Sequence, residues 1–273
     1  MIALIVAGEA IFLLPFVLAR IFRPTFLDVF GLTNFQLGSA FSVYGVVAMI
    51  SYFAGGPLAD RFPARQLMAT ALAATSLGGV VMATVPSLGV LTALYGFWGM
   101  TTILLFWAAL IRATREWGGP AAQGRAYGIL DGGRGLVAAL LASLSVAVFA
   151  AFLPLEVETA TLEERSEALS RVIWIFTGLT LAVAALVWAV LPGGSPQPVA
   201  GSRQRLSLAG VRRVMRMPAV WLQAIIVVCA YVGYKSTDDF SLYARDAFGY
   251  DDVAAARLGT VTRWGDKFTV QLL

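Results

Sequence analysis

Long apolar runs separated by short polar loops dominate the pattern of this chain. A helix needs about 20 apolar residues to cross a bilayer, so each run of that length predicts a transmembrane helix. The run at 66–111 is divided by a turn at Pro86 and Gly89. The pattern predicts six helices, at 2–19, 35–59, 66–85, 89–111, 126–153 and 172–191. A polar linker follows, and then a seventh helix from Pro218 and the start of an eighth.

Composition supports a membrane protein. Hydrophobic residues make up 59% of the 273 residues and charged residues 13%, whereas a soluble domain is about 25% charged. The pI of about 9.5 does not indicate nucleic-acid binding, because the basic residues lie between apolar runs and act as topology signals. Histidine is absent and Cys229 is the only cysteine, so we expect no metal site, cofactor or internal disulfide. The predicted fold class is an all-α polytopic membrane protein.

The arginines indicate an orientation in the membrane. They concentrate in the loops after the second, fourth and sixth helices, whereas the opposite loops hold most of the acidic residues, notably 156–167. The positive-inside rule therefore places the N-terminus in the cytoplasm. The first run lacks a basic leader and a cleavage site, so we expect an uncleaved span. The linker at 192–217 is expected to be cytoplasmic, with a short basic amphipathic helix in its second half.

The sequence GGPLADRFPARQ, residues 55–66, lies on the predicted cytoplasmic side. It resembles the loop signature of the major facilitator superfamily, and its matching residues are Gly56, Asp60, Arg61 and Arg65. Pro63 and Ala64 depart from the signature, where the family usually has Gly and a basic residue. The resemblance extends to about residue 262 and implies a six-helix bundle, with the matching charges acting as a latch at a cytoplasmic gate and Gly56 permitting close helix approach.

A facilitator of this type has twelve helices, and this chain has seven and the start of an eighth. The tail RWGDKFTVQLL also loses apolar character where an eighth span should continue. We therefore expect a truncated or frameshifted product. Its expected parts are a six-helix bundle at 1–191, a cytoplasmic linker at 192–217 and the start of a second bundle at 218–273.

Residues 107–135 resemble the fourth-to-fifth helix region of the organic-anion and sugar-phosphate symporter branch, in which a cytoplasmic Arg-Gly pair leads into a glycine-rich helix. The Gly-Pro signature of antiporters is absent from this helix. The resemblance implies a monomeric transporter in the cytoplasmic (inner) membrane, without enzymatic chemistry. It would move a small organic anion, such as a sugar acid, sugar phosphate or sulfonate, by alternating access, with a proton or sodium as the coupling ion.

Two arginines interrupt the first apolar run. An arginine at the bilayer centre costs about 2.5–3.5 kcal/mol, so Arg20 and Arg23 need an explanation. If the helix ends at Ala19, they snorkel to the outer headgroups. If it continues to about Phe30, they lie within the outer half of the membrane and share a helical face. In that case, the resemblance implies that they face an anionic substrate.

A weak internal repeat favours the second alternative. TFLDVFG at 25–31 resembles YARDAFG at 243–249, as expected if the first and seventh helices correspond. Counting back ten residues from Phe30 and Phe248 reaches Arg20 and Asp238, so we expect Asp238 or its neighbour to neutralise the arginines. The candidate substrate residues are Arg20, Arg23, Tyr44, Trp107, Tyr231 and Lys235. The candidate coupling network is Glu9, Asp131, Arg134, Asp238 and Asp239.

Three alternatives stay open. Asp131 and Arg134 form either a simple intrahelical pair or part of the site. Seven spans with Lys235 in the seventh are also compatible with a seven-helix receptor or retinal-binding protein, although the predicted orientation of the N-terminus argues against that class. Finally, the chain as it stands is compatible with a fragment that cannot transport.

Overall fold

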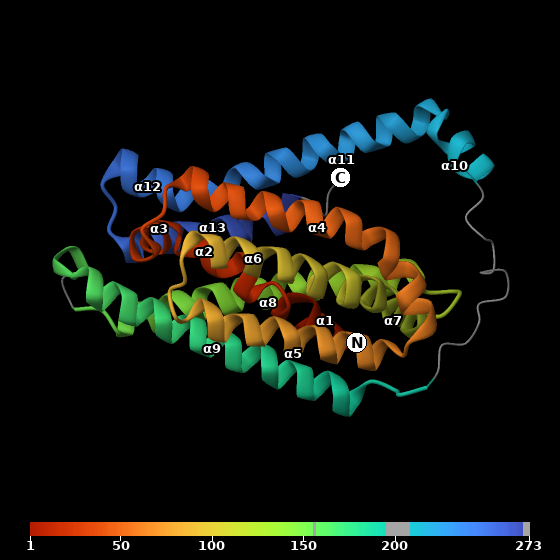
Figure 1. The fold of residues 1–273 in the computed structure, drawn as a ribbon, viewed down its shortest axis with the longest axis horizontal. Helices are drawn as coiled ribbons and strands as arrows, with labels where there is room; N and C mark the ends of the chain where they lie inside the picture. The colour runs from red at the N-terminus through yellow and green to blue at the C-terminus, as the bar shows by residue number, and fades with distance from the viewer. Residues whose placement is uncertain (155–156, 195–207, 270–273) are drawn as a thin grey trace.

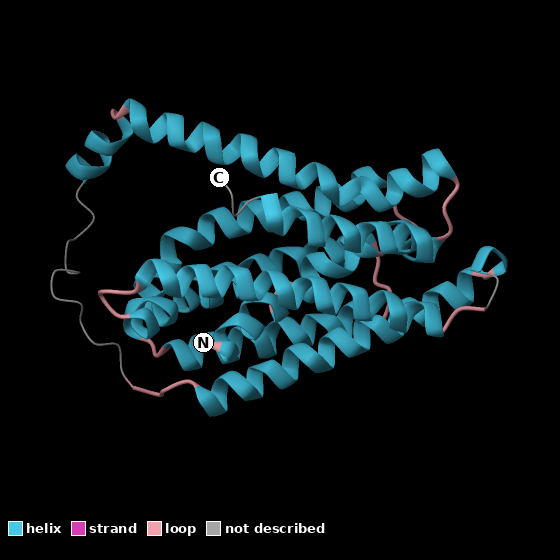
Figure 2. Cartoon of the chain, turned by 180° about the vertical axis from the view of Figure 1, so that it is seen from behind, coloured by secondary structure: helices cyan, strands magenta, loops and turns pink. Residues whose placement is uncertain are grey.

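The computed structural model describes residues 1–154, 157–194 and 208–269, and all regular elements within them are helices (Figures 1 and 2). The first part of the chain contains α1 (Ile2–Ala10), η1 (Leu13–Val17), α2 (Leu18–Ile21), α3 (Arg23–Phe30), α4 (Asn34–Arg61), α5 (Ala64–Met82), α6 (Leu88–Gly99), η2 (Met100–Trp107), α7 (Ala108–Gly118), α8 (Gln123–Ala151), η3 (Val157–Thr159) and α9 (Leu162–Val190). The second part contains α10 (Leu208–Met215), α11 (Pro218–Ser236), η4 (Thr237–Asp239), α12 (Phe240–Phe248) and α13 (Asp252–Thr269). The predicted all-α class is confirmed.

Helices occupy each predicted span. Among the described residues, five helices are long and apolar enough to cross a membrane, and six if the bent first segment counts as one span. Those five are Asn34–Arg61, Leu88–Gly118, Gln123–Ala151, Leu162–Val190 and Pro218–Phe248. The helix predicted at 66–85 is α5, which falls outside this group and has the polar residues Arg65 and Gln66 in its first turn.

Helix α9 starts well before the predicted residue 172. The side chain of Thr161 accepts a hydrogen bond from the backbone of Glu164, and the Glu164 carboxylate accepts one from the backbone of Thr161. This reciprocal capping box starts the helix inside the acidic loop. In the linker, a helix is present as α10 in the predicted second half. Residues 195–207 of the linker lie outside the described residues.

The first apolar segment is helical but broken. The chain bends by 42° between α1 and the helix that follows, where the backbone N–H of Phe12 bonds to the carbonyl of Glu9. A second break falls at Phe22, before Pro24. The segment ends at Gly31, which has a left-handed φ of 60°. The helical path therefore continues past Ala19, with the break at Phe22, to Phe30. The depth of Arg20 and Arg23 in the membrane stays a prediction.

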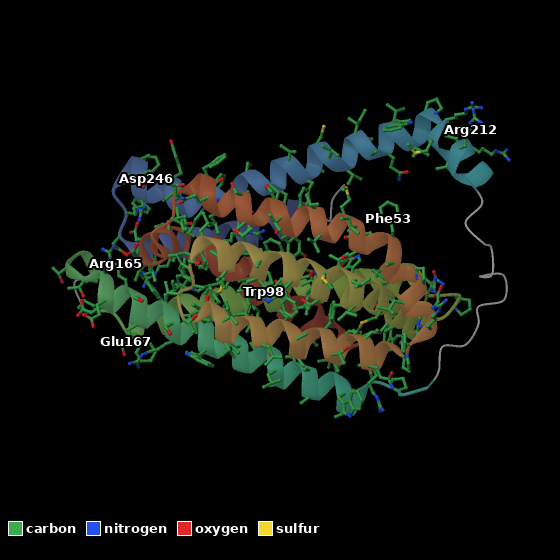
Figure 3. The ribbon with its side chains drawn as sticks, viewed as in Figure 1. Phe53, Trp98, Arg165, Glu167, Arg212 and Asp246 are labelled. Carbon is green, nitrogen blue, oxygen red and sulfur yellow. The ribbon has the colours of Figure 1, made fainter. Side chains whose placement is uncertain are left out.

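The elements of residues 1–194 pack into one bundle around a buried aromatic centre. Trp98 lies near its middle (Figure 3), is fully buried and donates a hydrogen bond from Nε1 to the carbonyl of Thr75, at 3.1 Å. Neighbouring helices approach closely where glycine removes the side chain. A Cβ added at Gly99 would lie 2.8 Å from the carbonyl oxygen of Tyr44, which is backbone and cannot move aside easily.

The described residues of the second part of the chain contact this bundle mainly towards one end. Helices α12 and α13 pack against α2, α3 and α8, whereas α11 runs along the outside without a buried residue (Figure 1). We call the end where α3 and α12 lie the α3 end, and the opposite end the α7 end. The main contacts between the two parts thus lie towards the α3 end.

Candidate functional site

Five charged side chains meet where the two parts of the chain touch. We call Arg20, Arg23, Lys235, Asp238 and Asp239 the paired-charge site. Arg20 pairs with Oδ1 of Asp238, and Lys235 pairs with Oδ2 of the same carboxylate. Nη1 of Arg20 also donates a hydrogen bond to the hydroxyl of Tyr234, at 2.7 Å. The side chains of Arg20 and Asp238 are 11% and 7% exposed, so this pair is largely withdrawn from solvent.

Arg23 forms the second half of this site. Its Nε lies 2.9 Å from Oδ1 of Asp239 and donates to Oδ1 of Asn34 at 2.8 Å. Nδ2 of Asn34 in turn donates to the same oxygen of Asp239, at 3.3 Å. Arg23 is 6% exposed and Asp239 51% exposed, so this half is closer to solvent on its acidic side. The predicted neutralisation of the arginines by Asp238 and Asp239 is therefore present in the structure.

Proline explains why the two segments can dock here. In an uninterrupted helix the carbonyl of Arg20 would accept a hydrogen bond from residue 24, but Pro24 has no N–H. The hydroxyl of Ser241 donates to that free carbonyl instead, at 3.2 Å. On the other side, the short η4 turn presents Asp238 and Asp239 at the join between α11 and α12. The breaks in both segments thus create the contact.

The charge of the paired-charge site does not balance. Three cations face two carboxylates, which leaves one excess positive charge. Each cation has a carboxylate partner, but the site as a whole carries a net positive charge, and a net positive charge attracts negative groups.

The predicted aromatic residues divide between different places. The ring of Tyr44 packs edge-on against Phe16, with centroids 4.6 Å apart, and its hydroxyl bonds to Thr102. Tyr231 is 61% exposed on α11 and contacts Tyr234. Trp107 lies beside a different charge cluster. Of the candidate substrate residues, the structure therefore unites Arg20, Arg23 and Lys235, with Tyr44 nearby and Tyr231 linked to Arg20 through Tyr234, and leaves Trp107 apart.

A second cluster joins α1 to α8. Nη2 of Arg134 lies 3.9 Å from Glu9, and its Nη1 lies 3.4 Å from Asp131. Its Nε donates to the carbonyl of Gly8 at 3.1 Å, and its guanidinium carbon lies 5.4 Å from the ring centre of Trp107. The bend after α1 explains this contact, because the N–H of Phe12 that would bind Gly8 bonds to Glu9 instead.

This second cluster contains the intrahelical pair and splits the predicted network; a role of the pair in the site stays a prediction. Asp131 and Arg134 do form the intrahelical pair, and Arg134 also contacts α1. The predicted coupling residues therefore fall in two places. Glu9, Asp131 and Arg134 lie together, while Asp238 and Asp239 belong to the paired-charge site.

A third group, at the α3 end, was missed by sequence reasoning. Asp28 lies 2.7 Å from Arg245 and 3.6 Å from Arg165, and Arg165 lies 3.0 Å from Asp252 (Figure 3 labels Arg165). We call these four residues the α3-end cluster. Burial raises the pKa of Asp252, the first residue of α13, while Arg165 and Arg245 act in the opposite direction. Two pairs, Asp28–Arg245 and Arg165–Asp252, join the first part of the chain to the second.

The loop that carries the superfamily signature lies at the α7 end. Asp60 and Arg61 are exposed and form no ion pair within the described part of the chain. The guanidinium of Arg65 lies 4.7 Å from the ring centre of Trp188. A Cβ added at Gly56 would meet nothing, whereas at Gly55 it would lie 3.2 Å from the carbonyl oxygen of Ile103. The predicted latch is therefore not formed among these residues and stays a prediction.

Three further residues at the paired-charge site were not anticipated. Asn34 bridges Arg23 and Asp239, while Phe16 and Phe41 lie beneath Lys235, with Nζ 5.6 and 5.7 Å from their ring centres. A sequence signal exists for Phe16, which precedes Arg20 by four residues and so shares its helical face. Asn34 carries no such signal, because its role depends on the turn that follows Gly31.

Comparison with known proteins identifies the family of this chain. The profile of the Major Facilitator Superfamily matches residues 2–262. The inner membrane protein YqcE of Escherichia coli (strain K12) is 27% identical over 246 residues, covering 89% of this chain and 56% of the relative. The inner membrane protein YihN of the same organism is 27% identical over 251 residues, covering 90% of this chain and 56% of the relative.

The chain thus spans little more than half the length of these curated relatives. No solved structure matches it. The apolar helices, the signature loop and the match over nearly the whole chain argue against the seven-helix receptor alternative. The chain belongs to the major facilitator superfamily.

Proposed function

We propose that the protein is a secondary active transporter of a small organic anion, of the sugar acid, sugar phosphate or sulfonate type. The observation that carries this proposal is the paired-charge site, where three cations face two carboxylates between the two parts of the chain. Family membership supports transport as the activity. The excess positive charge supports an anion as the substrate.

Arginine suits this role because its planar guanidinium binds carboxylate, phosphate or sulfonate through two parallel hydrogen bonds. In the structure, Arg20 and Lys235 already form ion pairs with Asp238. An incoming anion would take the place of Asp238 on Arg20 and leave Asp238 with Lys235. Binding would then weaken a contact between the two parts of the chain, which links substrate occupancy to their relative movement.

The rest of the cycle follows from where the two parts touch. The paired-charge site and the α3-end cluster both join them towards the α3 end. We propose that this end faces the outside, with the N-terminus and the signature loop in the cytoplasm, so that the structure corresponds to a state closed to the outside. Alternating access would open these contacts and close the α7 end through Asp60 and Arg61.

Coupling to an ion completes the proposal. Glu9 is buried and lies no closer than 3.9 Å to Arg134, its only ion-pair partner within the described residues. Together with Asp131, Asp238 and Asp239 it is a candidate to bind a proton or sodium. We propose that the protein works as a monomer in the lipid bilayer of the inner membrane.

A binding panel tests the substrate class. Purified protein should bind at least one radiolabelled sugar acid or sugar phosphate, and excess unlabelled anion should displace it, because the site requires a negative group. Neutral sugars of the same size are the matched control and should not compete. Binding of a neutral sugar with no binding of any anion in the panel would refute the proposal.

Cysteine labelling tests the orientation. In a Cys229→Ala background, Ser166→Cys near the start of α9 should react with an impermeant maleimide on intact cells. Gln123→Cys, exposed at the start of α8, should react only after the cells are permeabilised. The reverse pattern would place the α3 end in the cytoplasm and contradict the proposed orientation.

A further inference from the structure

Four aromatic side chains form a continuous row that begins beneath the paired-charge site. Lys235 lies over Phe16 and Phe41, whose ring centres are 5.7 Å apart. Phe16 lies 6.3 Å from Phe12, and Phe12 lies 6.3 Å from Trp107. We call Phe12, Phe16, Phe41 and Trp107 the aromatic strip. It ends at Trp107, beneath the guanidinium of Arg134.

The spacing in the sequence explains how the strip forms. Gly8, Phe12, Phe16 and Arg20 follow one another at intervals of four residues and therefore lie along one side of the first segment. The two phenylalanines thus occupy the space between the residue that binds Arg134 and the arginine of the paired-charge site. A cation lies at each end of the strip.

The strip is not sealed in the bundle core. Its side chains are half-buried, whereas neighbouring Ile11, Leu13 and Leu14 are 0% exposed. Lys235 of α11 contacts Phe16 and Phe41, so this end of the strip faces the second part of the chain. Partly open aromatic faces turned towards the other half, between two cationic groups, are suited to contact a ligand in addition to their packing role.

Aromatic faces recognise a particular shape. A flat or ring-shaped molecule stacks on them over a large area, whereas a flexible open chain must lose conformational freedom to make the same contact. Tyr44 and Tyr95 pack edge-on against Phe16 and Phe41, at 4.6 and 4.9 Å, and so hold both rings in fixed orientations. The strip is therefore preorganised.

We propose that the aromatic strip makes the protein selective for anions whose charged group is attached to a ring, with the ring stacked on Phe16 and the charge on Arg20. Phe16 and Phe12 are the residues that determine this specificity. The inference rests on the proposed anion transport and narrows its substrate class. The ring need not be aromatic, because a sugar ring also presents an apolar face.

Glucuronate and gluconate provide a matched pair of probes, since both are six-carbon sugar acids with one negative charge, and glucuronate is a ring while gluconate is an open chain. The parent should bind glucuronate about tenfold more tightly than gluconate. Phe16→Leu should remove this preference by weakening glucuronate alone. Phe16→Tyr, which keeps the ring, should retain it.

The control is Phe53→Leu, because Phe53 is 81% exposed on α4 and lies outside the strip; this variant should bind both anions like the parent. Thermal melting of Phe16→Leu close to that of the parent will show that it is folded. Equal binding of the two anions by the parent, or an equal loss of both in Phe16→Leu, would overturn ring selectivity while leaving anion binding intact. A parent that binds neither anion nor any other member of the panel would refute both proposals.

Discussion

Arg20→Lys is expected to insert into the membrane normally and to lose most of its anion binding. Lysine keeps the positive charge but has no planar fork, so it cannot form two parallel hydrogen bonds to a carboxylate or phosphate. It also cannot reproduce the simultaneous contacts of Arg20 with Asp238 and Tyr234. The expected loss of binding free energy is on the order of 2–5 kcal/mol, as for disruption of a buried charge-assisted pair.

Two further variants sharpen this test. Arg23→Lys should be milder, because Arg23 faces Asp239, which is 51% exposed. Arg115→Lys is the matched control, since Arg115 is exposed on α7 and outside the site, and it should bind like the parent. If the arginines only anchored the helix at the membrane surface, lysine would serve equally well. Undiminished binding by the Arg20→Lys, Arg23→Lys double variant would therefore disprove the site assignment.

Asp238→Asn should change anion affinity in the opposite direction. Asp238 competes with the substrate for Arg20, so its neutralisation should raise the affinity for the anion. In this variant without bound anion, Arg20 and Lys235 have lost the carboxylate with which both pair in the parent. Removal of one partner from such a largely buried group should cost on the order of 3 kcal/mol of stability. In thermal melting without anion, the variant should therefore be less stable than the parent. On addition of anion, the variant should gain more stability than the parent does.

Asp246→Asn is the control for this experiment, because Asp246 is exposed and its ion pair within the described residues is with the adjacent Arg245. It should melt and bind like the parent. A fall in anion affinity for Asp238→Asn would show that Asp238 helps to hold the substrate instead of competing with it.

The apolar runs were enough to predict the helices, because membrane burial requires a continuous stretch of apolar residues whatever the neighbouring helices are. The internal repeat also predicted a relation between two distant residues. It placed Arg20 and Asp238 at corresponding positions, and these two residues are ion-paired in the structure. The repeats also end alike, at Gly31 and Gly249, which have left-handed φ values of 60° and 67°. A helix end and a shared depth are local properties that a short motif can encode.

Contacts between distant segments could not be predicted in the same way. The α3-end cluster takes its residues from four helices, and Arg165 and Asp252 are far apart in the sequence without a motif that links them. The burial of Asp252 depends on how α13 docks. The separation of Trp107 from Arg20 likewise depends on how Trp107 packs against Phe12, between α1 and η1, and against Arg134 of α8. Such placements follow from packing, which hydrophobic periodicity describes only as a buried or exposed face.

Helix α11 has the mechanical character of a lever. Its 19 residues have no buried member, and its firm attachments lie at the end that continues into η4 and α12. A helix of that length is about 28 Å long, so a turn of about 10° around the attached end would displace the free end by roughly 5 Å. An exchange of partners at Arg20, on the scale of one hydrogen bond, would be enlarged at the far end to the width of a small molecule. The length of α11 would thus convert a small change at one ion pair into a larger displacement at the far end of the helix.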